Sequence, residues 1–285
     1  HTYSSSGTYV VKINSNSGTY RPYFNNSTDE DQIISVAIGI ESSSNSTGFG
    51  NNIERAFRHA QNMTKYNQVS AATSTVSDFE RTWLDCSGLT SFPLIDTSSG
   101  TNFGNTWAHC TGITTFPLID TSSGTNFGST WDSCSGLTSF PLIDTSSGTN
   151  FTLSWRDCSG ITTFPTIDTS SGTNFSSAWR NCTGLTTFPV LDTSSATSLL
   201  NAWRLCTGLT SFPQIDTSSV TNYNSAWREC SGITTFPSIN TSSGTNFGGA
   251  WNGCLALTSF PALNFSNGTS FGSAWRACRD IVEFP

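Results

Sequence analysis

The sequence predicts a repeat solenoid: nine 24-residue coils, each with a short strand, a turn and a short helix, and an N-terminal β cap. The first observation is a pattern, Trp-x-x-Cys-x-Gly-Leu/Ile-Thr-Ser/Thr-Phe-Pro, that recurs every 24 residues. The second is that this pattern uses all nine tryptophans and all nine cysteines of the chain. A fixed period of about 20 to 50 residues is typical of stacked repeats, in which each unit contacts only its neighbours.

The composition is far from the average of a globular protein. Only 11% of the 285 residues are charged, against about 25% in typical domains. Apolar residues that recur in strict phase argue against disorder. A net charge of −7 with 12 Lys plus Arg leaves no basic stripe, so nucleic acid is not an expected partner. No long apolar run and no signal-peptide pattern is present, so membrane insertion is not expected either. The start at His1 suggests a processed product or a portion of something longer.

The chain divides into three regions. Residues 1–50 lie outside the period and contain two β-branched runs, 8–13 and 33–40, which predict a β-rich cap or assembly segment. Residues 51–82 hold a degenerate first repeat, in which Phe57, Ala60 and Met63 take the Trp, Cys and Leu/Ile positions. Residues 83–285 form the regular array. An atypical terminal repeat and a cap are common in such arrays, because they cover the end of the stack.

Within one coil, the structural ladder is expected to consist of Trp107, Cys110, Gly112, Phe116 and Pro117. Phe103, Trp107 and Cys110 have the spacing i, i+4, i+7, which predicts one face of a short helix. Gly112 would end this helix in the left-handed conformation. Residues 113–116 predict a short strand that is closed by Pro117. After the proline, a variable position is expected to face outward and the invariant Ile or Leu beyond it to face the core.

The regular cysteines allow three interpretations. A zinc site wants cysteines two to four residues apart, whereas no two lie closer than 24 here. Disulfides between stacked coils fit the expected distance, but parallel side-chain vectors and the odd number of cysteines oppose them. We favour packing as a small buried residue whose thiol donates to a backbone carbonyl. No cofactor is expected.

Six carboxylates also recur in one column, and two asparagines complete it. Calcium between the carboxylates is one interpretation, because hard cations take such oxygens. The favoured one is an Asx-turn, in which each side chain accepts a local backbone N–H; Asn can do this as well. The column consists of Asp96, Asp120, Asp144, Asp168, Asp192 and Asp216, followed by Asn240 and Asn264.

Catalysis has little support in the sequence, and no enzyme is expected. His59 and His109 share a column but lie two coils apart, and no nucleophile accompanies them at an arguable spacing. Thr and Ser pairs, such as Thr114-Thr115, form a hydroxyl ladder that suggests glycan or ice binding, or simply a solvated surface. Variation is concentrated around each Trp, so specificity is expected on that face.

Asn-x-Ser/Thr sequons indicate candidate glycosylation sites and hence a glycoprotein if the host modifies secreted proteins. They begin at Asn25, Asn26, Asn45, Asn62, Asn150, Asn174, Asn181, Asn240, Asn264 and Asn267.

The array resembles the BspA-type leucine-rich repeats of bacterial surface proteins, relatives of which also occur in phage and environmental viral fibre proteins. The resemblance covers residues 51–285 and rests on Trp107, Cys110, Ile113 and the turn 120–122. The chain departs from the family in carrying Trp where many members have Phe. The resemblance implies an extracellular or surface-located, non-enzymatic array that serves adhesion, contacts a host or ligand, or forms a stalk.

The functional expectation is therefore a structural or adhesive solenoid, a subunit of a surface appendage, fibril or viral fibre. Charges on the final segment 279–284 are typical of a protected sheet edge. The other interpretation of that end is a head-to-tail contact with the N-terminal β segment of another copy, which would build a filament. Glycans or a cell-surface receptor are further expected partners. The alternative function is a soluble glycan-binding or ice-binding solenoid that uses the Thr/Ser ladder.

Overall fold

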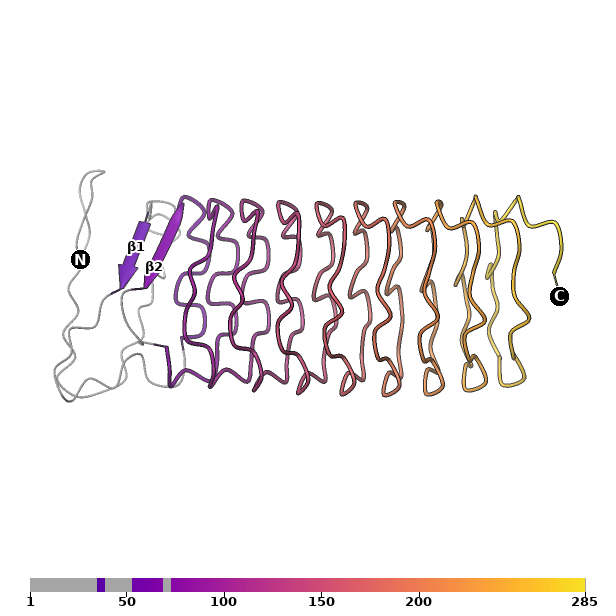
Figure 1. The fold of residues 1–285 in the computed structure, drawn as a ribbon, viewed down its shortest axis with the longest axis horizontal. Helices are drawn as coiled ribbons and strands as arrows, with labels where there is room; N and C mark the ends of the chain where they lie inside the picture. The colour runs from indigo at the N-terminus through magenta and orange to yellow at the C-terminus, as the bar shows by residue number, and fades with distance from the viewer. Residues whose placement is uncertain (1–34, 39–52, 69–72, 285) are drawn as a thin grey trace.

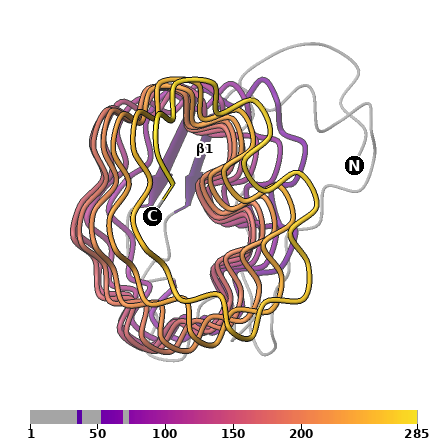
Figure 2. The same ribbon diagram turned by 90° about the vertical axis from the view of Figure 1, so that its right-hand side faces the viewer.

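The computed structural model describes residues 35–38, 53–68 and 73–284, and in this part the chain forms a straight stack of coils (Figure 1). Viewed from its end, successive coils superpose around a common interior (Figure 2). Strand β1 (Ser35–Ile38) pairs in parallel with β2 (Lys65–Gln68), with Ser35 opposite Lys65. β1 lies within the expected run 33–40, while the expected run 8–13 lies outside the described residues. The solenoid prediction is confirmed in its coarse form.

In the described coils the expected short helix is absent. Phe103, Asn105, Trp107 and His109 instead donate their N–H groups to carbonyls of the next coil, at N···O distances of 2.7–2.9 Å. The residues between them close tight turns, as in the bond from the N–H of Cys110 to the carbonyl of Trp107 at 3.2 Å. Linked turns, and not a helix, therefore bring Phe103, Trp107 and Cys110 to the inner side of this segment. We call residues 103–110 and their equivalents in the other coils the Trp wall. The helix prediction was wrong because half of its donors serve the neighbouring coil.

Left-handed residues make this wall possible. Two positions in each coil have positive φ, two residues before and two residues after the tryptophan, as at Asn105 (54°) and His109 (63°). Such a conformation costs an L-residue roughly 1–2 kcal/mol, but it turns the N–H toward the next coil, where it finds a carbonyl. Gly112, which was expected to be left-handed, is not among the positive-φ residues.

Residues 113–119, which follow the Trp wall in each coil, are also less regular than a strand. Ile113, Phe116 and Ile119 are buried, whereas the two residues between each pair are exposed or partly exposed. This spacing of three differs from the alternation of a pleated strand. Only one bridge, between Thr235 and Ser259, is assigned in this segment of the described coils, and the ladder bond from Thr138 N–H to Thr114 carbonyl is 3.2 Å long. Pro117 cannot donate a further bond. The strand prediction was wrong because the buried residues recur every three positions instead of alternating, and because Pro117 cannot donate a ladder bond.

The core consists of columns of identical side chains. Each tryptophan from Trp83 to Trp251 is fully buried, and neighbouring indoles are stacked with centroids 5.4–5.9 Å apart. Phe116 packs edge-on against Trp107 at 4.8 Å. Phe57 stacks on Trp83 at 6.1 Å, so the degenerate repeat continues the column. Ile119 is 2% exposed and Leu118 63% exposed, which confirms the expected inward and outward positions after the proline.

Gly112 and its equivalents are required by the close approach of consecutive coils. A Cβ at Gly136 would lie 2.3 Å from the carbonyl oxygen of Thr111 and 3.0 Å from that of Ile113. These carbonyl oxygens belong to the contact between consecutive coils, so they cannot move aside without disturbing that contact. Glycine is therefore required at this position because consecutive coils approach each other closely, and not because of its backbone conformation.

We expect Gly136→Ala to lower the free energy of unfolding by about 1–3 kcal/mol, the typical range for overpacking. Gly272→Ala is the matched control, because a Cβ there meets nothing within 4 Å. Thermal unfolding followed by circular dichroism measures both variants. Equal shifts of the melting temperature would show that the close approach at Gly136 does not limit the fold.

Candidate functional site

The cysteines occupy the interior in the way that was favoured from the sequence. All nine are free thiols in the described residues, and eight of them are buried, Cys278 being partly exposed. Each thiol donates to a carbonyl of the preceding coil, as Cys110 does to Trp83 at 3.1 Å and Cys158 to Trp131 at 3.0 Å. Burial raises the pKa of the Cys206 thiol to about 12. The buried thiols therefore stay protonated, and the cysteine column has a structural role.

The Asp column forms local turns. Asp120 Oδ1 accepts the backbone N–H of Ser122 at 3.0 Å and its hydroxyl at 2.7 Å. These bonds, the hydroxyl first, lower the pKa of Asp120 below its ordinary value. Asn240 makes the same two contacts with Ser242. The expected Asx-turns are thus present, and the described residues contain no group of three or more His, Cys, Asp or Glu that could hold a metal ion.

The sequons fall into two structural settings. Asn150, Asn181 and Asn267 each use the Nδ2 amide group as a hydrogen-bond donor, to Asn126, Asp157 and Ser242 respectively. Asn240 and Asn264 lie exposed in the turn column, where their Oδ1 atoms accept the backbone N–H groups of Ser242 and Ser266. Asn62 is exposed and Asn174 accepts from Ser176. Asn25, Asn26 and Asn45 lie outside the described residues.

The Thr/Ser pairs form an exposed surface along the rod. Both members of the pair face solvent in every regular coil from Thr90-Ser91 to Thr258-Ser259. Beside them, the variable position after the proline carries exposed apolar residues in the first coils, with Leu94 at 72% and Leu142 at 63%. Hydroxyls and methyl groups therefore share this face of the array.

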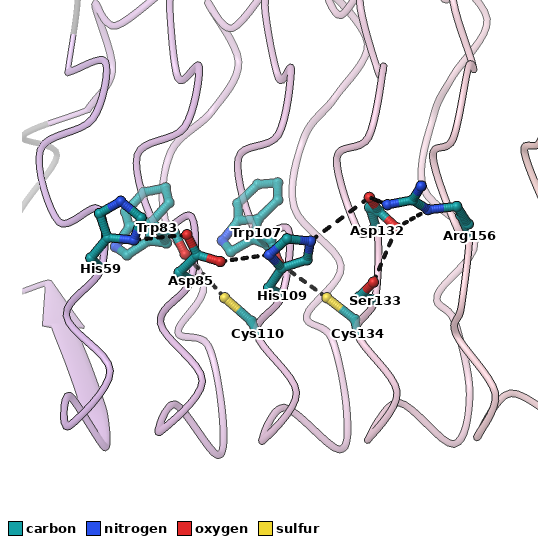
Figure 3. A network of polar contacts seen from close by, with 10 residues as sticks. All are labelled: His59, Trp83, Asp85, Trp107, His109, Cys110, Asp132, Ser133, Cys134 and Arg156. Atoms are coloured by element: carbon teal, nitrogen blue, oxygen red, sulfur yellow. Dashed lines mark hydrogen bonds and ion pairs between the residues drawn. The ribbon is translucent and has the colours of Figure 1, made fainter.

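A second surface follows the two residues after each tryptophan. At its N-terminal end, Asp85 accepts from His59 Nδ1 at 2.8 Å and from His109 Nδ1 at 2.5 Å, so one carboxylate joins three coils (Figure 3). His109 Nε2 lies 4.0 Å from Asp132 Oδ2. Asp132 is bound by both Nε (2.8 Å) and Nη2 (2.5 Å) of Arg156. The two histidines thus meet through a carboxylate that lies in the coil between them.

The same surface changes its character toward the C-terminal coils. The position directly after the tryptophan is Arg in four consecutive coils, at Arg156, Arg180, Arg204 and Arg228. Arg156 is neutralised by Asp132, which raises the pKa of the guanidinium. The pKa of Arg204 is lowered, by burial first and then by the charges of Arg228 and Arg180. We call Arg180, Arg204 and Arg228 the arginine column.

Sequence reasoning located this variable face but did not connect its residues across coils. The available signal was the 24-residue spacing itself, which places His109 near Asp85 and stacks the arginines. In the described part of the chain, no helix is long and apolar enough to cross a membrane.

No family model matches the chain, and no curated protein matches it. Among solved structures, a leucine-rich repeat protein from Eubacterium ventriosum is 15% identical, with a TM-score of 0.40 over 94% of this chain and 91% of that one. A leucine-rich repeat protein from Bacteroides ovatus is 12% identical, with a TM-score of 0.40 over 95% of this chain and 92% of that one.

Proposed function

We propose that the chain is a non-enzymatic structural or adhesive rod at a cell or virion surface. The observation that supports this most is the continuity of the interior: the stacked aromatic column runs from Phe57 to Trp275 through every described coil of the array. Contacts of the same kind repeat at each step, so the described rod has a nearly constant cross-section (Figure 2). Such a stack holds surface groups at a fixed spacing and separates its two ends, as a stalk or display scaffold requires.

The surface chemistry agrees with a binding role better than with catalysis. His59 and His109 are joined through Asp85, and in the network of Figure 3 no contact joins either of them to the Ser133 hydroxyl, which donates to Asp132, or to a cysteine thiol. An open depression on the described surface is lined by Gln214, Asp216, Ser238 and Asn240, and it offers amide, carboxylate and hydroxyl groups without a closed pocket. Enzymes usually enclose most of a small substrate in a concave site.

Self-assembly is part of this proposal. The indole of Trp275 stacks on that of Trp251 with ring centroids 5.4 Å apart. In the same coil Phe271 is partly exposed and Phe284 is 54% exposed. A second copy that docks its N-terminal end there, where β1 precedes the first coil (Figure 1), would bury these rings and extend the stack head to tail. Contacts of this kind do not close into a ring, so they would produce a filament or fibre.

Negative-stain electron microscopy at increasing protein concentration tests the proposal. We expect straight rods at low concentration and longer rods of the same width at high concentration. A Trp275→Asp variant should remain as single rods, because a charge in the contact is desolvated without a partner. Rods whose length does not depend on concentration would contradict head-to-tail assembly, and compact particles would contradict the rod itself.

A second candidate function is recognition of glycan or ice by the Thr/Ser ladder. It is favoured by the exposure of both hydroxyl-bearing residues in each regular coil. Thermal hysteresis would support ice binding. A neutral-glycan array would detect sugar recognition, and the loss of its signals in Thr138→Lys would locate that recognition on this face.

A further inference from the structure

We propose that the arginine column, formed by Arg180, Arg204 and Arg228, binds a linear acidic polysaccharide that lies along the rod. This inference deepens the adhesive part of the proposed function and rests on it. Three consecutive coils present the same cationic group directly after the stacked Trp179, Trp203 and Trp227.

The spacing of the column suits an extended ligand. Backbone N–H···O bonds join these coils, at 2.9 Å from Trp179 to Ala202 and 2.8 Å from Trp203 to Ala226, so the bases of the three arginine side chains repeat at about 4.8 Å along the axis. Alternate side chains of an acidic peptide in a strand repeat every ~6.6–6.8 Å, about 2 Å more. A peptide would therefore fall out of register over two intervals. A polysaccharide with carboxylate or sulfate groups along its length can follow the straight column, since each Arg offers a planar fork to such groups.

The charges of the column are only partly neutralised by the protein. Among the described residues, arginine ion pairs involve Arg55, Arg81, Arg156 and Arg228, and none involves Arg180 or Arg204. Arg228 reaches Glu229 at 3.3 Å. Arg204 Nε is buried without a hydrogen-bond partner. Like charges in adjacent coils repel one another, and an anion that bridges them would remove this repulsion.

The neighbouring side chains favour a sugar over a nucleic acid. Asn201 lies three residues before Arg204 and is partly exposed, whereas the amide of Asn181, next to Arg180, already donates to Asp157. Amides of this kind can bond to sugar hydroxyls. Nucleic-acid binding depends on many Lys and Arg contacts to phosphates, whereas this column supplies three arginines. In the described coils, Arg follows the tryptophan at four successive positions of this stripe, and Asp132 binds the first of them, Arg156.

The test compares binding of dextran sulfate and polygalacturonate with binding of neutral dextran, by biolayer interferometry at two salt concentrations. We expect the wild-type chain to bind one or both acidic polymers and not dextran, with weaker binding at higher salt. Arg180→Gln/Arg204→Gln/Arg228→Gln should lower the affinity at least tenfold. Arg55→Gln/Arg58→Gln/Arg81→Gln is the matched control, because it removes the same charge from distant coils.

Circular dichroism establishes that both triple variants are folded, and Arg204→Gln alone provides a milder change if the triple variant is not. Equal loss in both triple variants, or no binding of either acidic polysaccharide, would overturn the proposal. Tighter binding of a single-stranded oligonucleotide or of polyglutamate would overturn it as well. The rods and their assembly in electron micrographs are independent of these outcomes, so failure of this site leaves the proposed scaffold role to be judged separately.

Discussion

Trp155→Ala is expected to lower the free energy of unfolding by about 3–5 kcal/mol, the range for deleting a buried large aromatic side chain. Trp155 is fully buried and lies between Trp131 and Trp179, each at a centroid distance of 5.5 Å. It also contacts the edges of Phe140 and Phe164. Because coils contact only their neighbours, the defect should weaken the coupling between the two halves of the stack as well.

Guanidinium unfolding followed by circular dichroism measures this effect. We expect a lower midpoint and a broadened or two-step transition, since the two halves would no longer unfold together. Trp275→Ala is the control, because Trp275 is partly exposed and stacks on a tryptophan on one side only. If both variants lost the same stability, the continuous column would not be what couples the coils.

Alkaline pH should destabilise the protein through the cysteine column. Burial raises the pKa of each of the eight thiols from Cys110 to Cys278 above the ordinary value of 9.0. The folded state therefore keeps protons that the unfolded chain releases above pH 9. With fewer protons bound in the unfolded state, stability falls as pH rises. The contribution is fully present below pH 9 and is lost between pH 9 and the folded pKa, which is about 12 for Cys206.

For one thiol, the loss between pH 8 and pH 10 is about 1.4 kcal/mol. Urea unfolding under reducing conditions at these two pH values gives the total slope. The variant Cys158→Ala/Cys182→Ala/Cys206→Ala should lose about 4 kcal/mol less over this interval than the wild-type chain does. The cavities that these substitutions create lower stability equally at both pH values, so they cancel. An unchanged slope would contradict the role of the thiols.

The sequence was sufficient to identify which side chains form the core. The 24-residue phase placed Trp107, Cys110 and Phe116 in common columns, and all three are buried. Burial of this kind follows from residue type and repetition, so it does not depend on the backbone conformation. The Asx-turn at Asp120 was predictable for a similar reason, because its partners lie two residues away.

The backbone of the Trp wall was not predictable from the apolar spacing alone. Both a helix and a row of linked turns bring Phe103, Trp107 and Cys110 to one side. The deciding signal lies two residues before and after each tryptophan, where Asn105 and Gly253 are residue types that tolerate a left-handed conformation. Leu153 and Leu205 adopt it as well. At these two positions the hydrogen bonds to the next coil, which no local pattern reveals, outweigh the local preference.

The variable surface illustrates the same limit for the candidate site. Arg204 lies on the variable face expected around each Trp, but its role depends on Arg180 and Arg228, which lie 24 residues away on either side. The contact between His109 and Asp85 is of the same type. Such relations become visible only when the coils are superposed in register.

The coils are stacked along the axis of the rod (Figure 1), so the hydrogen bonds that leave one coil for the next run along the rod rather than around it. A pulling force applied to the two ends would therefore act on one coil boundary after another. Each boundary that opens would release 24 residues, which can extend by about 80 Å at 3.3–3.6 Å per residue. A stretched rod of this construction would lengthen in equal steps and dissipate work at each one, in the manner of an extensible tether under load.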